Sequence, residues 1–553
     1  MNHTASDSVA EPPGGLGDEV PAHDDGDGQP NDLHLGSFSD RPPWSMADEE
    51  IEWLDIIGVL RRHQAKQLPD LLKPPRVPPL KRAVRVLTVI GRTIAIWRLR
   101  ERGTEKSRAG LSRRVRESAE ILGPTYIKLA QIISAGEGVF PPELVAECKK
   151  CRDQVPAVAF ERIIEVVEQD LGTPVSELFA EFDPIPVAAA SIAQVHRAKL
   201  ATGQRVVVKV QRPDIDLVVR RDLAVLSWLA PHLVGRIPVS ALANPPALVE
   251  LFAETIIEEL DFRLEAANML DVGRVFAELD QRNFIVPRPH PSHVTRRVLV
   301  MEELNGFNFD DVTSMRQAGV DTEAVLKTGM IGFLEGVFLH GVFHGDLHGG
   351  NLFIMADGRT ALMDFGITGR LTEHERLAFL RMMMSATTNN VSGQIQALRD
   401  LGALPPDTDI NAVIADLGLD GPPLDPTTLA PDQLVKELQR VVKALLAYGA
   451  RMPKPLMLYV KNLIFIDGAT ATLAPELDLF AAITEVATHF ATTHGSTIAN
   501  QLGLEQQGWD LDLDGMKAGF GVDPSQTTSL TYADLQARRK LIRQRLGSRR
   551  DLA

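Results

Sequence analysis

Cysteine is nearly absent from the sequence, with 2 residues among 553. A chain with so few cysteines cannot be a scaffold held together by disulfides. Long apolar runs are missing as well, since no stretch reaches the roughly eighteen residues typical of a membrane-spanning helix. Residues 1–20 have neither the basic region nor the apolar core of a secretory signal. We therefore expect a cytoplasmic protein.

Charge is distributed unevenly along the chain, although the net charge is −15. Residues 1–50 contain twelve acidic residues and one base, Arg41, whereas residues 73–108 contain eleven basic and two acidic residues. Residues 1–46 are also rich in Gly, Pro, Asp and Ser, so we predict that this acidic tail is disordered. The sequence leaves open whether translation starts at Met1 or at Met46.

The order of apolar patterns predicts an α+β fold with a small mixed lobe and a larger helical lobe. Helical periodicity over 112–180 is followed by strands over 185–210, helices over 214–279, a strand over 296–304 and a long helix over about 322–341. We divide the chain into an acidic tail (1–46), a linker with a basic amphipathic helix (47–110), a helical extension (111–182), the small lobe (183–305), the helical lobe (306–495) and a C-terminal tail (496–553).

The basic segment follows a proline-rich linker and reads "LKRAVRVLTVIGRTIAIWRLRERG". One interpretation is a helix over residues 80–100 that lies on an anionic membrane surface at the inner face of the membrane. The other is an ordinary helix that packs on the body of the protein and leaves its arginines in water. We keep both interpretations, and we expect no nucleic-acid partner.

The segment "HGDLHGGNLFIMADGRTALMDFG" carries polar residues at a spacing typical of phosphoryl transfer. Asp346 would accept a hydroxyl proton or orient water, and Asn351 and Asp364 would supply the hard oxygen ligands that Mg²⁺ prefers. The alternative is a coincidental polar turn. The ordered set, with its gaps, favours a site for ATP or ADP with Mg²⁺.

Lys209 lies within the apolar strand "VVVKVQ", where a buried ammonium group is costly unless it is paired. In a kinase such a lysine binds the nucleotide phosphates and pairs with a glutamate on a helix. The alternative is a lysine whose head reaches solvent at a strand edge. The segment "EELDFRLEAANML" offers the partners Glu259, Asp261 and Glu265. The last two are four residues apart, so we expect a cation or metal opposite that helix face.

Two further segments would contact the nucleotide. "RRVLVMEELNG" resembles a hinge in which backbone groups of Met301, Glu302 and Leu304 would meet the adenine edge. The glycine-rich loop expected before Lys209 is replaced by alanines and a serine, at Ala188, Ala189, Ala190 and Ser191. Because alanine disfavours the positive φ angles that glycine permits, this loop should be more restricted.

These features together resemble the UbiB/AarF family of atypical kinases, also called ADCK proteins, over about residues 110–485. The resemblance is clearest in "AAASIAQVHRAKLATGQRVVVKVQRPDI" and "LGPTYIKLAQIISAGEGVFPPELVAECKKCRDQVP". Lys128 and Gln131 match the family's Lys-x-Gly-Gln motif, in which Ala130 replaces the glycine. Glu259 and Asp261 match its Glu-x-Asp motif, and Glu265 its helix glutamate.

The catalytic loop departs from the usual His-Ala-Asp-Pro-His-Pro-Gly-Asn of the family. Here "HGDLHGGN" keeps His344, Asp346, His348 and Asn351 but changes the small and proline positions. We expect both histidines to support the loop rather than to bind a metal. Cys148 and Cys151 form a C-x-x-C, but a structural zinc site needs four ligands and no second pair exists, so we expect both in the core.

The resemblance implies a protein-kinase-like bilobal fold in which the Lys-x-Gly-Gln segment covers the active site. It also implies an atypical kinase or ATPase that uses ATP or ADP with Mg²⁺ in isoprenoid quinone or other lipid metabolism. Members often have C-terminal membrane helices, which this sequence lacks, so residues 80–100 are the candidate membrane contact. Two alternatives stay open: a small-molecule kinase similar to aminoglycoside and choline kinases, and a non-catalytic scaffold that senses nucleotide.

Overall fold

The computed structural model describes most of the chain. The described residues are 43–44, 51–102, 107–134, 140–151, 156–234, 245–419, 433, 440–441, 444–445, 447–450, 452–503, 512–519 and 529–547. The predicted disordered tail (1–46) lies outside them, apart from Pro43 and Trp44. Trp44 is packed rather than free, because its indole N–H donates to the Pro289 carbonyl at 3.0 Å and its ring lies 4.9 Å from that of His290.

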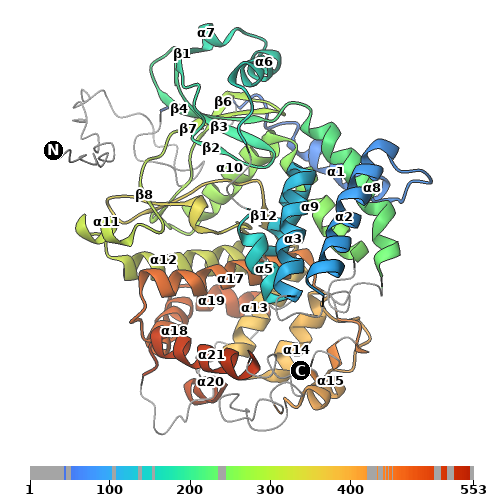
Figure 1. Cartoon of the computed structure of the whole chain (residues 1–553). Coiled ribbons are helices and arrows are strands. Elements are labelled where there is room, and N and C mark those ends of the chain that lie inside the picture. Colours follow the sequence, from blue (N-terminus) through green and yellow to red (C-terminus); the bar gives the residue numbers. More distant parts are fainter. Residues whose placement is uncertain are drawn as a thin grey trace, which may run out of the picture.

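Seven helices precede the first strand among the described residues, and the last five of them fall in or overlap the region 112–180 that the periodicity predicts to be helical. They are α1 (Ile57–Leu72), α2 (Leu80–Arg100), α3 (Ser107–Leu122), α4 (Pro124–Ser134), α5 (Pro142–Lys149), α6 (Phe160–Leu171) and α7 (Val175–Leu178). Figure 1 shows α2, α3 and α5 along one side of the molecule, beside both lobes. Cys148 and Cys151 are buried there, and burial raises the pKa of the Cys148 thiol to about 12. The predicted core position of both cysteines is confirmed.

The small lobe is built on an antiparallel sheet at the top of Figure 1. Its strands are β1 (Phe179–Phe182), β2 (Ala188–Ala189), β3 (Ala193–Leu200), β4 (Arg205–Gln211), β6 (Pro289–Val294) and β7 (Val298–Glu302), in the order β1-β3-β4-β7-β6 with β2 on β3. One face of the sheet carries buried valines at alternate positions of β4 and β7 (Val206, Val208, Val210, Val298 and Val300). α6 covers this face with Ile163, Val166 and Val167.

Three helices follow β4 and join the sheet to the rest of the molecule: α8 (Ile215–Leu233), α9 (Pro245–Glu259) and α10 (Phe262–Glu278). α10 contacts β6 and β7 on the side of the sheet opposite α6. α4 packs against α8 and α9, and α2 packs on α8. Arg82 of α2 holds the fully buried Asp222 of α8, with Nη2 2.8 Å from Oδ2. The N-terminal helices are therefore a fixed part of the fold.

Short strands lie between the two lobes. They form two further sheets, one of β5 (Phe284–Ile285), β8 (Phe307–Asn308), β10 (Leu352–Ile354) and β11 (Thr360–Leu362), the other of β9 (Val342–His344) and β12 (Thr368–Arg370). The sequence predicted only the short apolar strand before Asp364, which is β11, because two or three residues are too few to show an alternating pattern.

The helical lobe lies at the bottom of Figure 1. Its described helices are α11 (Val312–Gln317), α12 (Thr322–Glu335), α13 (Glu373–Thr387), α14 (Val391–Asp400), α15 (Ile410–Leu417), α17 (Lys454–Leu473), α18 (Leu479–His489), α19 (Gly495–Leu502), α20 (Leu513–Gly519) and α21 (Tyr532–Gly547). π-helical turns extend α12 over Gly336–His340 and α18 over Phe490–His494. A small mixed lobe, a larger helical lobe and a helical N-terminal region confirm the fold class predicted from the sequence.

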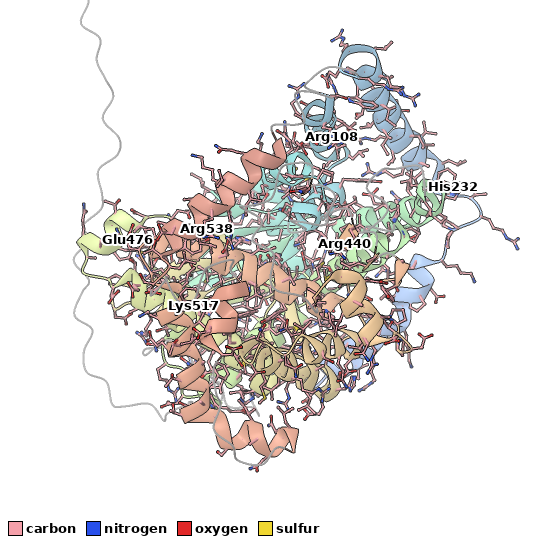
Figure 2. The ribbon with its side chains drawn as sticks, turned by 90° about the horizontal axis from the view of Figure 1, so that it is seen from below. Arg108, His232, Arg440, Glu476, Lys517 and Arg538 are labelled. Atoms are coloured by element: carbon pink, nitrogen blue, oxygen red, sulfur yellow. The ribbon has the colours of Figure 1, made fainter. Side chains whose placement is uncertain are left out.

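One described helix, α17, passes a length and composition test for crossing a membrane. In this fold α17 packs against α12 and α21, as expected for the core helix of a lobe. The predicted C-terminal tail (496–553) contributes to this packing, because Arg539 of α21 contacts Asp467 of α17 at 2.7 Å. Figure 2 views the molecule from this side and labels Lys517 on α20 and Arg538 on α21.

Candidate active site

A β-hairpin places the two predicted metal ligands side by side. Asn351 directly precedes β10 and Asp364 follows β11 by two residues, and the pairing of Leu352 with Leu362 brings these ends together. The Met363 N–H also donates to the Asn351 carbonyl at 2.8 Å. Asp364 has φ +60°, a left-handed conformation that is rare outside glycine. Such strain persists where the surrounding structure enforces it, often at functional sites.

Lys209 of β4 connects the small lobe to this hairpin. Its Nζ lies 2.7 Å from Glu265 Oε1 on α10 and 3.1 Å from Asp364 Oδ1. Burial alone would lower the pKa of Lys209, but the two carboxylates outweigh it and raise the pKa. Burial raises the pKa of Glu265 to about 7 in spite of this contact. For Asp364, burial acts in the same direction, but Lys209 and Lys128 hold its pKa below the usual range.

Asp346 pairs with a lysine that sequence analysis missed. Lys461 of α17 forms an ion pair with Asp346 Oδ1. The next residue, Asn462, is fully buried, and it accepts a hydrogen bond from the Leu347 N–H at 3.1 Å and donates one to the His344 carbonyl at 2.5 Å. Lys461 and Lys128, with His348, outweigh burial and keep the pKa of Asp346 below its usual range. Asp346 is therefore an ionised carboxylate.

The two histidines of the catalytic loop form hydrogen bonds within it. His344 Nε2 donates to the Met363 carbonyl at 3.0 Å, and its Nδ1 accepts from the Asp346 N–H at 3.2 Å. Burial lowers the pKa of His344, which favours this neutral tautomer. His348 Nδ1 accepts from the Gly350 N–H at 3.1 Å. Both contacts fit the supporting role expected from the sequence.

The N-terminal extension reaches the site through Lys128. Its Nζ lies 2.5 Å from Glu259 Oε1 at the end of α9, where Glu259 is buried and the Lys128 side chain is 13% exposed. Burial alone would lower the pKa of Lys128, but Glu259, Asp346 and Asp364 raise it. A Cβ at Gly366 would lie 3.3 Å from Glu259 Cγ, so glycine lets this carboxylate approach the segment after Asp364 closely. Gln131 lies half-buried on the same helix, α4.

We had expected from their spacing that Asp261 and Glu265 share a helix face, but they do not. Asp261 is the N-cap of α10 and lies outside the helix, where it accepts from the Arg263 N–H at 3.2 Å. Its carboxylate also pairs with the Arg263 guanidinium at 2.6 Å. The cation near Glu265 is Lys209, so the two acids have separate partners. That expectation was wrong because the helix begins one residue after Asp261.

A polar cluster on α10 fixes the segment that follows Asp364. Asn268 Nδ2 donates to the Phe365 carbonyl at 2.9 Å, and its Oδ1 accepts from Arg370 at 2.7 Å. Asp271 pairs with Arg370 at 2.5 Å and with Arg61 of α1 at 3.1 Å. The N-terminal helix α1 is thereby linked to the active-site segment through α10. Sequence spacing gave no signal for these residues.

The hinge residues lie at the end of β7. Met301 pairs with Val207 and Glu302 with Val206 of β4. The Glu302 N–H donates to the Arg288 carbonyl at 2.9 Å, so this donor is used within the sheet. Leu304 lies just past the strand and is buried. The Glu302 N–H is therefore already used within the sheet, and Met301 lies inside the pairing of β7 with β4 and β6.

The alanine loop forms a tight hairpin on β3. Ala188 pairs with Val195 and Ala189 with Gln194, and the Ala190 carbonyl accepts from Arg212 Nε at 3.0 Å. Residues 188–191 all have negative φ angles, so no residue of this hairpin requires glycine. The conformation of the loop is one that alanine readily adopts.

Changing Ala188, Ala189 or Ala190 singly to glycine should loosen this hairpin and alter the ratio of ATP to ADP affinity. Each change should cost about 0.5–1 kcal/mol of stability, because glycine loses more entropy on folding. Titration calorimetry with both nucleotides and a phosphate-incorporation assay measure the effect. Ala201→Gly, in the exposed turn between β3 and β4, is the matched control and should lose stability alone. Parent-like affinities in all three variants would mean that the loop is not a restraint.

Comparisons with known proteins identify a protein family and several relatives that this chain resembles. The ABC1 atypical kinase-like domain family matches residues 150–398. An uncharacterized protein of Mycobacterium tuberculosis is 34% identical over 366 residues, 65% of this chain and 74% of that protein. A probable protein kinase UbiB of Marinobacter nauticus is 32% identical over 372 residues, covering 66% and 68%. An uncharacterized chloroplastic aarF domain-containing protein kinase of Arabidopsis thaliana is 32% identical over 395 residues, covering 66% and 72%.

The matched segment 150–398 contains Lys209, Glu265, Asp346 and Asp364. The two lysines that lie against its carboxylates, Lys128 and Lys461, come from outside it. Lys128 belongs to the N-terminal extension and Lys461 to α17. Both of these parts of the fold therefore pack against the matched domain.

Proposed function

Because the chain belongs to the UbiB/AarF family of atypical kinase-like proteins, we propose that it binds ATP or ADP with Mg²⁺. We further propose that it hydrolyses the nucleotide or transfers a phosphoryl group in isoprenoid quinone or other lipid metabolism at a membrane surface. The observation that carries the proposal is the contact of Lys209 with both Glu265 and Asp364. This contact links the two lobes at the point where the phosphates of a nucleotide would lie.

The residues present fit a magnesium ion. Asn351 uses its amide nitrogen to donate to the Asp346 carbonyl at 3.0 Å, which leaves its amide oxygen for a metal. Asp364 uses Oδ1 for Lys209 and Gly366, so Oδ2 is the expected ligand atom. The Asp364 side chain is 49% exposed and therefore accessible. When bound, Mg²⁺ would neutralise phosphate charge through these oxygen ligands.

The chain's own residues would position the acceptor. Asp346 is ionised and held by Lys461, so it can accept a hydrogen bond from an attacking hydroxyl group or water molecule and orient it. Lys209 would bind phosphate oxygens of the nucleotide. These contacts would replace part of its contact with Asp364. The Lys128–Glu259 pair sets a helical extension beside the catalytic carboxylates. This supports a small acceptor or water rather than a protein substrate.

Nucleotide hydrolysis with and without anionic liposomes tests the proposed function. We expect Mg²⁺-dependent hydrolysis that rises when liposomes are present, and no hydrolysis by Asp346→Asn. A screen of small hydroxylated and lipid acceptors then distinguishes a lipid kinase from a small-molecule kinase of the aminoglycoside type. Nucleotide binding with no turnover under any of these conditions would favour the nucleotide-sensing scaffold.

α2 supports the proposed membrane contact. Its buried face is formed by Ala83 and Val86, so the helix does pack on the body of the protein. It also exposes an apolar stripe of Leu80, Val84, Leu87 and Ile94, which the helical repeat places on one side. The exposed Lys81, Arg85 and Arg92 lie beside this stripe. The packing of one face of α2 is therefore compatible with a membrane contact through its exposed face.

Replacing Lys81 and Arg92 together with glutamine should weaken binding to anionic vesicles roughly 30-fold, because each basic residue near such a surface contributes about 1 kcal/mol. Flotation of the full chain with phosphatidylserine vesicles at low and high salt measures this. The control removes two exposed basic residues elsewhere, Arg205→Gln with Lys540→Gln, and should float like the parent. An equal loss of vesicle binding in both double variants would contradict a specific contact by residues 80–100. Vesicle binding that does not depend on the salt concentration would contradict it as well.

A further inference from the structure

A second group of polar side chains lies at the far end of α12, where α18 crosses it. His489 Nε2 lies 2.7 Å from Glu335 Oε1, and His494 Nε2 lies 2.8 Å from the same oxygen. These three ligand atoms lie within 4.8 Å of one another, and this is the one such group found among the described residues. None of the three residues belongs to the nucleotide site or to any motif of the sequence analysis.

Two π-helical turns bring these side chains together. One covers Phe490–His494 and directly follows His489, and the other covers Gly336–His340 and directly follows Glu335. A π-helical turn aligns residues five apart, so it sets His489 and His494 on the same side of their helix. Such turns are rare and occur often at functional sites. The presence of two π-helical turns at one cluster is a local distortion, and helix packing alone does not require it.

The charge of Glu335 is poorly compensated by protein groups. The residue is 1% exposed, and its Oε2 accepts from Gln281 Nε2 at 2.5 Å. Its ion pairs among the described residues are with His489 and His494, which are cationic only when protonated. A buried carboxylate is costly unless a positive charge is close to it. A divalent cation would supply that charge while both imidazoles remain neutral.

We propose that Glu335, His489 and His494 bind a first-row divalent transition-metal ion. Two imidazoles and one carboxylate form a ligand set typical of zinc and iron in proteins, and unlike the oxygen ligands that Mg²⁺ prefers. Around Zn²⁺ the ligand atoms would lie about 3.3 Å apart, since each bond is about 2.0–2.2 Å. The two nitrogen–oxygen distances, 2.7 and 2.8 Å, would therefore open by on the order of half an ångström, which side-chain rotation permits.

The surroundings fit this role. Gln281 holds the second carboxylate oxygen and so orients Glu335, as residues that hydrogen-bond to metal ligands do. The His489 side chain is 30% exposed, which provides an entry path and a position for water as a further ligand. The turn after Glu335 leads through Gly341 into β9 and then to Asp346. A bound ion would tie the start of the catalytic loop to α18.

Zn²⁺ is the probe for this site. The full chain, freed of metal with a chelator, should bind one Zn²⁺ in competition with a fluorescent indicator. His489→Gln and His494→Gln should each weaken this affinity roughly 100-fold or more, and Gln281→Leu about 10- to 100-fold, because it removes only an orienting group. His232→Gln is the matched control: His232 is exposed on α8 (Figure 2), bonds to a carbonyl of its own helix and should bind like the parent.

Co²⁺ provides a spectroscopic readout of the ligand set. Its visible absorption should show low-coordinate nitrogen and oxygen ligands in the parent and in His232→Gln, and should disappear in His489→Gln. If a histidine variant unfolds, Gln281→Leu still tests the site by its graded loss. Unchanged Zn²⁺ affinity in all three cluster variants, or no one-to-one binding by the parent, would overturn the proposal and leave a hydrogen-bonded cluster without a metal.

Discussion

Asp364→Asn should abolish the Mg²⁺-dependent part of ATP binding. The side chain lies at the open end of the β10–β11 hairpin, beside Asn351, and is the most exposed carboxylate of the site. Asparagine keeps its shape but removes the charge that a divalent cation requires. ATP at about 100 times its Kd stabilises a protein by about 2.7 kcal/mol. The variant should keep only the part of this stabilisation that remains in EDTA.

Thermal unfolding with ATP, in Mg²⁺ and in EDTA, measures this loss. Asp357→Asn is the matched control, because Asp357 lies exposed in the turn of the same hairpin and pairs with Arg359 at 2.7 Å. This control should respond to Mg²⁺ like the parent. A variant at Asp364 that retains the full Mg²⁺ effect would show that the ion binds elsewhere.

The spacing of Asp346, Asn351 and Asp364 could be predicted from the sequence because all three lie close together in the chain, and the short β10–β11 hairpin positions Asn351 and Asp364. Local structure of this kind leaves its signal in consecutive residues: apolar strands, a Gly-containing turn and polar ends. The Lys209–Glu265 contact spans 56 residues, yet it too was predicted. A lysine among valines needs an acidic partner, the sequence offered Glu259, Asp261 and Glu265, and the resemblance to the family singled out Glu265.

Lys461 and Asn462 were missed because they lie 115 residues or more beyond the loop that they contact. No spacing rule links α17 to Asp346. A signal was present all the same, since Lys461 interrupts an otherwise apolar stretch of α17, and a charge in such a position needs a partner. The error at Asp261 has a different origin. A capping aspartate and a helical one look alike when the helix start is uncertain by one residue.

The prediction that residues 1–46 are disordered is wrong at Trp44, because average composition does not reveal single packing contacts. Acidic composition predicts disorder on average, but one tryptophan beside prolines can pack on a sheet edge, as Trp44 does on β6. The C-terminal helices contain no catalytic motif, and their role as packing partners of α17 depends on single contacts such as Arg539–Asp467. Contacts of this kind become visible only in three dimensions.

Lys209→Met should destabilise the protein in a manner that depends on pH. Lys209 and Glu265 are 7% and 3% exposed, so the change leaves a buried carboxylate without its cation. Breaking a buried pair in this way costs about 3–5 kcal/mol when the remaining group stays charged. The pKa of Glu265 is already raised by burial to about 7, and loss of the lysine raises it further. At low pH the carboxylate is therefore protonated, and the cost is small.

The direction of this pH dependence follows from proton binding to Glu265. A carboxyl group whose pKa is higher in the folded than in the unfolded state stabilises the fold only while it is protonated. The unfolding free energy of Lys209→Met should hence fall, relative to the parent, as pH rises above about 7, where the parent's Glu265 is ionised and the variant's is still protonated. Urea unfolding across this range measures the fall. Adding Glu265→Gln to Lys209→Met removes the titrating group, so the double variant should lose the pH dependence and regain part of the stability at high pH. A single variant with the same deficit at every pH would show that Glu265 finds another cation when Lys209 is removed.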